Sequence, residues 1–156
     1  MAVDIGDKAP DFKLFDHNKN EVSLKDYESK NLVILFFPFA FSNVCTKELC
    51  NVRDNFFEYK DLEAEVIGIS VDALYTLKKF HDELKLDFPL LSDFNKDISQ
   101  AYGAYYEEFS YGMKGVSRRS VFVVDTEGNI RYAEILESAG DLPDLDAVLG
   151  TLTNLV

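Results

Sequence analysis

The stretch LVILFFP at residues 32–38, with the helix-like run at residues 42–59 that follows it, decides the fold of this chain. The first six of these residues are all apolar, which is typical of a strand that is buried on both faces of a sheet. Pro38 has no amide hydrogen to donate to a sheet, so the strand is expected to end there. Apolar residues then recur every three or four positions, as in an amphipathic helix whose start is capped by Ser42 or Asn43. These residues predict a buried strand, a short loop and a helix.

The rest of the chain carries a second strand and helix, and then a hairpin and a last helix. The expected elements are an N-terminal hairpin at 11–15 and 21–24, a buried strand at 66–71, a helix at 72–84, an extended piece at 88–91, a helical segment at 96–102, a hairpin at 121–124 and 130–135, and a helix that opens at Pro143. This order predicts an α/β fold with a central mixed sheet flanked by helices. The pattern is thioredoxin-like. With no repeat and no linker, a single domain over residues 1–156 is expected.

Composition excludes several classes of function. The 156 residues include 28 acidic side chains against 16 Lys plus Arg, which gives a formal charge of -12. Nucleic acids and anionic membrane surfaces require clustered cations, so neither is expected as a partner. The longest apolar run, residues 32–37, is far shorter than the roughly 20 residues that span a bilayer. The first residues carry early acids and no signal-peptide pattern, which favours a cytoplasmic protein.

The two cysteines, Cys45 and Cys50, are too few for a disulfide scaffold,. A zinc site needs about four ligands, and the remaining soft candidates, His17 and His81, are isolated, so neither a metal nor a cofactor is expected. Cys45 falls in the first turn of the predicted helix, where free amide groups and the helix dipole stabilise a thiolate. Cys45 is therefore a candidate nucleophile, and the alternative is a small buried apolar residue.

The segment from Pro38 through Ser42 to Cys45 resembles the active-site signature of the peroxiredoxins, which place Pro seven residues and Thr or Ser three residues before the peroxidatic cysteine. Further resemblance lies at residues 6–12, 46–49 and 119–125, and together these segments extend over nearly the whole chain. The resemblance implies a thioredoxin-like fold and an antioxidant oxidoreductase. Such an enzyme reduces hydrogen peroxide and alkyl hydroperoxides through a cysteine thiolate, which becomes a sulfenic acid.

The resemblance also implies a role for each residue of the site. Cys45 supplies the sulfur, and the Ser42 hydroxyl, one turn earlier, reaches the sulfur and a bound peroxide oxygen. Arg119 supplies a permanent positive charge and planar donors. Pro38 walls off the pocket with Phe37, Phe39 and Phe41. The segments that must meet at the site, residues 31–47 and 109–124, contain no Asp or Glu.

Some of these assignments have a plain structural alternative. Ser42 can be an N-cap residue only, and most of the aromatic residues near Pro38 can be ordinary core. Arg118 and Arg119 are adjacent and would point to opposite faces of a strand, so Arg119 is expected in the site and Arg118 in solvent. Glu48 matches a family position at which a glutamate orients the arginine, and a surface glutamate is the alternative.

Cys50 raises the question of how the oxidised cysteine is recycled. Five residues along a helix place two Cα atoms about 9 Å apart, whereas a disulfide needs about 7 Å or less. If Cys50 resolves Cys45, the first turn of the helix must therefore unwind. The spacing resembles the peroxiredoxin Q (bacterioferritin comigratory protein) subgroup, in which the resolving cysteine lies five residues on. Residues 88–93, 99–103 and 131–134 resemble the one-cysteine E-type alkyl hydroperoxide reductases, whose reductant is external.

These two resemblances leave Cys50 as either a resolving residue, which is preferred, or a bystander. The expected partners are a peroxide and thioredoxin or a similar thiol reductant, and both a monomer and a homodimer remain open. A thioredoxin-like thiol-disulfide oxidoreductase is the competing function, but four residues separate the cysteines where such enzymes have C-x-x-C,. A non-enzymatic interaction module is the third possible function. Neither explains why Pro38, Ser42, Cys45 and Arg119 occur together.

Overall fold

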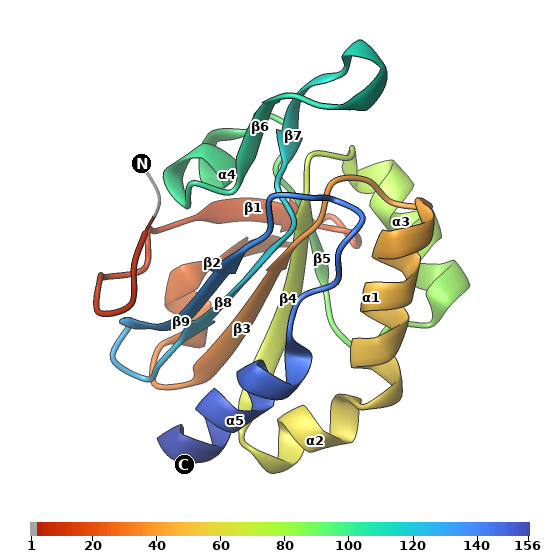
Figure 1. Ribbon diagram of the computed structural model, residues 1–156. Coiled ribbons are helices and arrows are strands. Elements are labelled where there is room, and N and C mark those ends of the chain that lie inside the picture. The colour runs from red at the N-terminus through yellow and green to blue at the C-terminus, as the bar shows by residue number, and fades with distance from the viewer. Residues whose placement is uncertain (1–2) are drawn as a thin grey trace.

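The computed structural model describes residues 3–156 as a mixed sheet with helices on it and a small two-stranded sheet at one end (Figure 1). The strands are β1 (Lys13–Asp16), β2 (Glu21–Ser23), β3 (Asn31–Phe36), β4 (Ala64–Ser70), β5 (Leu90–Ser92), β6 (Tyr105–Glu108), β7 (Lys114–Ser117), β8 (Ser120–Val124) and β9 (Ile130–Ile135). The helices are α1 (Asn43–Asp54), α2 (Phe56–Asp61), α3 (Leu74–Leu84), α4 (Asp97–Ala101) and α5 (Leu145–Leu155). Within the described residues, no helix combines the length and the apolar character that a membrane crossing requires.

The main sheet has the order β2-β1-β5-β4-β3-β8-β9. As predicted, β3 lies inside it, and all six of its residues are buried. It pairs in parallel with β4 and antiparallel with β8, so the sheet is mixed. The N-terminal and C-terminal hairpins, β1–β2 and β8–β9, both form and supply the two edges of the sheet. These findings confirm the predicted α/β, thioredoxin-like arrangement.

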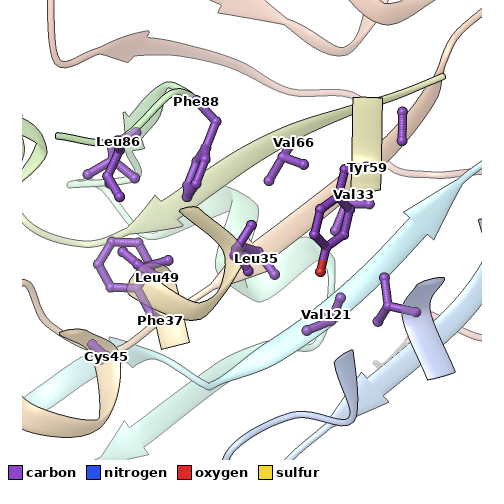
Figure 2. Close-up of a cluster of buried hydrophobic side chains, with 14 of the residues drawn as sticks. Val33, Leu35, Phe37, Cys45, Leu49, Tyr59, Val66, Leu86, Phe88 and Val121 are labelled. Carbon is purple, nitrogen blue, oxygen red and sulfur yellow. The ribbon is translucent and has the colours of Figure 1, made fainter. Parts of the chain in front are cut away.

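The alternation of side chains along β3 divides the core into two layers. Val33 and Leu35 face one layer, where they pack with apolar residues of α1, α2, α3 and α5. Ile34 and Phe36 face the other, with Tyr102 among their neighbours. Figure 2 shows Cys45 at the margin of the first layer, near Phe37 and Leu49. Cys45 is therefore anchored in the larger of the two core clusters.

Three predicted helix boundaries were wrong. The helix expected at 42–59 is two helices, because the backbone turns at Asn55 (φ -111°, ψ 19°), whose side-chain amide donates to the Asn51 carbonyl at the end of α1. The helix expected from Asp72 begins at Leu74, since the Asp72 carboxylate binds groups outside the helix. The last helix begins at Leu145 rather than Pro143 because the carboxylate of Asp144 caps it, accepting the Ala147 amide at 3.0 Å.

The sequence prediction also missed the hairpin of β6 and β7, which projects from the end of the main sheet in Figure 1. Strand β6 carries charged and partly exposed residues and β7 is mostly buried, but neither shows the apolar alternation of a half-buried strand,. At its tip, Tyr111 (φ 60°) and Gly112 (φ 75°) adopt left-handed backbone conformations. This hairpin matters for the site because β7 leads directly into Arg118 and Arg119.

Candidate active site

The loop between β3 and α1 carries Pro38 to Ser42 across the carboxyl end of β3, with Pro38 buried. Phe41 has a positive φ of 69°, a conformation that costs about 1 kcal/mol for a residue with a side chain,. Two hydrogen bonds hold the loop in this shape. The Ala40 amide donates to Asp72 Oδ2 at 2.7 Å, and the Ser42 hydroxyl donates to the Phe39 carbonyl at 2.9 Å.

Cys45 is the third residue of α1, in its first turn as predicted, and its side chain is fully buried. Neither Cys45 nor Cys50 is part of a disulfide. Unpaired amide groups at a helix start and the helix dipole both favour a negative charge there. The first turn of α1 contains no acidic residue that would oppose this effect.

Arg119, the residue before β8, reaches Cys45 from a distant part of the chain. Its Nη2 lies 3.2 Å from the sulfur, and its Nη1 lies 2.7 Å from Glu48 Oε1. Nε and Nη2 also donate to the Ala139 carbonyl, at 3.2 and 2.9 Å. Burial alone would lower the pKa of Arg119, but the neighbouring Cys45 and Glu48 outweigh burial and raise it. The arginine therefore stays charged beside the sulfur.

Glu48 lies one turn after Cys45 on α1, and none of its surface is exposed. The alternative of a surface glutamate was therefore wrong. Burial raises the pKa of Glu48 to about 7, an effect that Arg119 opposes and the carboxylate of Glu134 reinforces. Its second oxygen, Oε2, is buried and has no hydrogen-bond partner among the described residues.

Arg118 and Arg119 point to different partners, as expected, and only Arg119 reaches Cys45. They lie between β7 and β8 rather than within a strand. The expectation that Arg118 lies free in solvent was wrong, because it is half-buried and donates from Nε to the Leu136 carbonyl at 2.8 Å. Its guanidinium also lies 5.1 Å from the centre of the Tyr106 ring, which is a cation–π distance,.

Ser42 occupies the N-cap position, but its side chain makes no capping hydrogen bond. Its exposed hydroxyl instead donates to Phe39, three residues earlier, so the interpretation of Ser42 as a side-chain cap was wrong. No hydrogen bond joins this hydroxyl to Cys45 within the described part of the chain. Its expected reach to the sulfur and to a peroxide stays a prediction.

The three phenylalanines around Pro38 differ in their surroundings. Phe37 is fully buried and belongs to the core. Phe39 is half-buried, with its ring edge-on to Phe109 of the segment after β6. Phe41 is 47% exposed and its ring centre lies 5.0 Å from that of Phe80 on α3. Plain core therefore describes Phe37, whereas Phe39 and Phe41 form part of the surface beside the site.

Cys50 lies on α1, five residues after Cys45, and is partly exposed. Helix α1 runs without interruption from Asn43 to Asp54, so both cysteines lie on one intact helix. The helical geometry keeps their Cα atoms about 9 Å apart. A Cys45–Cys50 disulfide would therefore require the first turn of α1 to unwind from the helix seen here. This unwinding stays a prediction.

Two contributors to the site had not been predicted. Asp72 clamps the loop through Ala40 and also accepts the Ser70 hydroxyl at 2.7 Å. The position of Asp72 just after a buried strand could have predicted this role, because the carboxyl ends of neighbouring parallel strands meet at one edge of a sheet. The sequence could not predict the role of the Ala139 carbonyl, since every residue has a backbone carbonyl.

The assembled site holds a candidate nucleophile beside a fixed cation. The sulfur of Cys45 and the guanidinium of Arg119 lie within hydrogen-bonding distance of each other, and both are buried. An O–O bond attacked by the sulfur spreads negative charge over sulfur and both oxygens, and fixed donors stabilise that charge. The arrangement suits nucleophilic attack on a peroxide.

The chain is similar in sequence and in fold to known proteins. Residues 5–133 match the model of the AhpC/TSA family. A relative from Mycobacterium tuberculosis (strain H37Rv), designated a peroxiredoxin, is 44% identical over 131 residues, 83% of each chain. Alkyl hydroperoxide reductase E of the same strain is 38% identical over 145 residues, 91% of each. The crystal structure of peroxidoxin BcpB from Mycobacterium tuberculosis superposes with a TM-score of 0.86, at 30% identity over 97% of both chains.

Proposed function

The chain belongs to the AhpC/TSA family and is a thiol-dependent peroxidase, in which we propose that Cys45 is the peroxidatic cysteine and Arg119 its electrostatic partner. The observation that carries this assignment is the 3.2 Å contact between Arg119 Nη2 and Cys45 Sγ inside the protein. The contact places a permanent cation at the atom that must be an anion to react. The proposed substrates are hydrogen peroxide and alkyl hydroperoxides.

In the proposed reaction, the Cys45 thiolate attacks one peroxide oxygen. An S–O bond forms, the O–O bond breaks, and the sulfur becomes a sulfenic acid, while the leaving oxygen takes up one proton and departs as an alcohol or water. Arg119 stabilises the charge that moves from sulfur to the leaving oxygen. The buried Pro38 and Phe37 limit water, which strengthens the interaction between these charges,.

The Ser42 hydroxyl is the proposed donor to the bound peroxide. In the reduced protein it is held by the Phe39 carbonyl at the mouth of the loop. A hydroxyl rotates freely and has two acceptor lone pairs as well as its proton. Ser42 can therefore exchange its backbone partner for a substrate oxygen without a change in the backbone.

Recycling completes the proposed function. Cys50 attacks the sulfenic acid, water leaves, and a disulfide forms that thioredoxin or a similar thiol reduces. Cys50 suits this role because it is partly exposed on the same helix. An external thiol that attacks Cys45 directly is the alternative route.

The assignment is tested by rapid mixing of the reduced protein with one equivalent of hydrogen peroxide. Wild type is expected to form sulfenic acid at Cys45, trapped by a sulfenic-acid reagent and located by peptide mass. Cys45→Ser is expected to lose the reaction, and Cys50→Ser to keep the first oxidation but lose recycling. Cys45→Ser activity equal to that of wild type would contradict the assignment.

A further inference from the structure

Three groups of the site share a single cation. Arg119 donates to Cys45 Sγ at 3.2 Å and to Glu48 Oε1 at 2.7 Å, and its third partner is the uncharged carbonyl of Ala139. Cys45 and Glu48 are fully buried, and Arg119 is 1% exposed. A thiolate and an ionised Glu48 would together place two negative charges against one positive charge, without water to solvate the excess. Such an excess charge is costly in a buried site.

The two oxygens of Glu48 have different surroundings, and the difference favours a proton on Glu48. Oε1 accepts a strong hydrogen bond from Arg119, whereas Oε2 is buried with no partner in the described chain. A buried, unpartnered oxygen is more costly on a carboxylate than on a neutral carboxyl group. Burial raises the pKa of Glu48 to about 7 even against the opposing effect of Arg119.

Building on the peroxidase function above, we propose that Glu48 holds the proton that Cys45 releases, so that the reactive site is a Cys45 thiolate and a neutral Glu48 bridged by Arg119. Glu48 then does more than orient the arginine. It lets the full charge of Arg119 act on the thiolate, and it carries the proton that the reaction consumes.

The reaction balances with this proton. Glu48–COOH, Cys45–S⁻ and ROOH become Glu48–COO⁻, Cys45–SOH and ROH, in which R is hydrogen or an alkyl group. The sulfur is oxidised, the peroxide is reduced, and the leaving oxygen ends with the proton that Glu48 held. Because the sulfenic acid is neutral, Arg119 keeps only one anionic partner, so an ionised Glu48 is now favoured. When a thiol regenerates the Cys45 thiolate, Glu48 takes up a proton again.

Glu48 is itself fully buried, but it borders a cavity that offers a path for this exchange. A cavity of about 380 Å³ lies between the outer side of α1 and the start of α5, and Glu48 is one of its lining residues. The charged or titratable groups around Glu48 are Cys45 and Lys47 on α1, Tyr59 on α2, Arg119 before β8, Glu134 on β9, and Asp144 and Asp146 at the start of α5. Most of these are acidic or neutral, which favours a proton on Glu48 over a second charge.

The proposal is tested by counting protons. Reduced protein at about pH 6, one unit below the pKa of Glu48, is mixed with one equivalent of hydrogen peroxide in weak buffer with a pH indicator,. The thiolate is followed by its ultraviolet absorbance and the oxidised Cys45 by mass. Wild type is expected to start as the thiolate and to take up no net proton. Glu48→Gln, which is permanently neutral, is expected to take up one proton per cysteine oxidised.

A second measurement and a control complete the test. Infrared difference spectra of wild type should lose a carboxylic-acid carbonyl band on oxidation, and Glu48→Gln should lack that band. The matched control is Glu65→Gln, a partly buried carboxylate on β4 whose Oε2 accepts the Lys60 ammonium at 3.3 Å, away from Arg119 and Glu48. It is expected to behave as wild type in both measurements.

The outcomes separate this inference from the function on which it rests. Uptake of one proton by wild type, or a wild-type protein that starts as the thiol at this pH, would overturn the role of Glu48 and leave the peroxidase intact. Absence of any Cys45 oxidation would overturn both. The deciding proton counts are made on wild type, so they distinguish these outcomes even if Glu48→Gln fails to fold.

Discussion

Arg119 joins the two halves of the site, since it follows β7 in the chain and contacts two residues of α1, Cys45 and Glu48. Its partners lie 71 and 74 residues away in sequence, so the contact exists only in the folded protein. The guanidinium presents donors in a fixed plane, which a lysine cannot do. The fixed positive charge at the sulfur therefore depends on Arg119 and on the backbone that holds it.

Arg119→Met is expected to slow the oxidation of Cys45 by hydrogen peroxide about 10²- to 10³-fold, as loss of a preorganised donor does in other enzymes. The measurement is the second-order rate constant from stopped-flow mixing. Arg118→Met is the matched control, because Arg118 is adjacent but binds the Leu136 carbonyl and the Tyr106 ring instead of the sulfur. Equal rate constants for the two variants would contradict the role of Arg119.

Asp72 is a positioning residue for the loop between β3 and α1. Asp72→Ala removes the acceptor of the Ala40 amide and is expected to slow Cys45 oxidation about tenfold, because small misplacements of reacting groups are costly,. Asp72→Asn keeps an acceptor oxygen and should restore most of the rate.

Asp93→Asn provides the control for Asp72. Asp93 also follows a strand and accepts backbone amides, those of Ile98 and Ser99, but it holds α4 rather than the loop of the site. It should change the melting temperature without changing the rate constant. A rate loss in Asp93→Asn as large as that in Asp72→Ala would show that both act only through stability.

Helix α1 is the element on which the proposed recycling by Cys50 depends. It contains Cys45 and Cys50 in one unbroken run, and it begins after Phe41, whose backbone is held in a left-handed conformation by the loop contacts. Strain at a helix start lowers the free energy needed to open the first turn. The start of α1 is therefore suited to local unwinding after oxidation.

If Cys50 resolves Cys45, peroxide treatment should increase hydrogen exchange in the amides of residues 43–50 and leave β3 protected. The reason is that the disulfide cannot form on an intact helix. In Cys50→Ser the same treatment should leave α1 protected. A Cys45–Cys50 disulfide formed without any change in exchange at α1 would contradict this account.

The sequence predicted those elements that have a local pattern. The apolar run of β3, the first turn of α1 and the antiparallel hairpin β8–β9 all carry signals that depend on neighbouring residues only. The break at Asn55 and the β6–β7 hairpin do not, because each depends on contacts that form after folding. The pairing of Glu48 with Arg119 was expected from the family resemblance, but its burial and its free Oε2 had no sequence signal.

At the scale of the whole molecule, the distribution of charge matters more than the formal total of -12. The stretches 31–47 and 109–124, which contain no Asp or Glu, do meet, through the contact of Arg119 with Cys45. The carboxylate nearest to this contact is Glu48, one residue beyond the first stretch. The acidic groups are therefore kept away from the sulfur except for the one that pairs with its arginine.

The two histidines connect the N-terminal hairpin to α3. The rings of His17 and His81 stack with centres 3.6 Å apart, and His17 Nδ1 accepts the Leu90 amide at 3.3 Å. Burial, and then the neighbouring His81, lower the pKa of His17. A protonated His17 would lose its acceptor nitrogen and face a second imidazole.

Stability should therefore depend on pH through His17. Because its folded pKa is below the unfolded value of about 6.5, the unfolded chain binds the proton more readily, so stability falls as the pH drops below that value,. His17→Asn is expected to flatten this part of the melting-temperature profile. An unchanged slope between about pH 7 and pH 5 would contradict the prediction.

The most direct test of the central claim, that Cys45 beside Arg119 is the peroxidatic nucleophile, is the site of first oxidation. The reduced protein is mixed with one equivalent of hydrogen peroxide, quenched with a sulfenic-acid reagent within the first turnover, and mapped by peptide mass. The account predicts the adduct on Cys45 in wild type and Cys50→Ser, with a much slower yield in Arg119→Met. An adduct on Cys50, or an equal yield in Cys45→Ser, would contradict it.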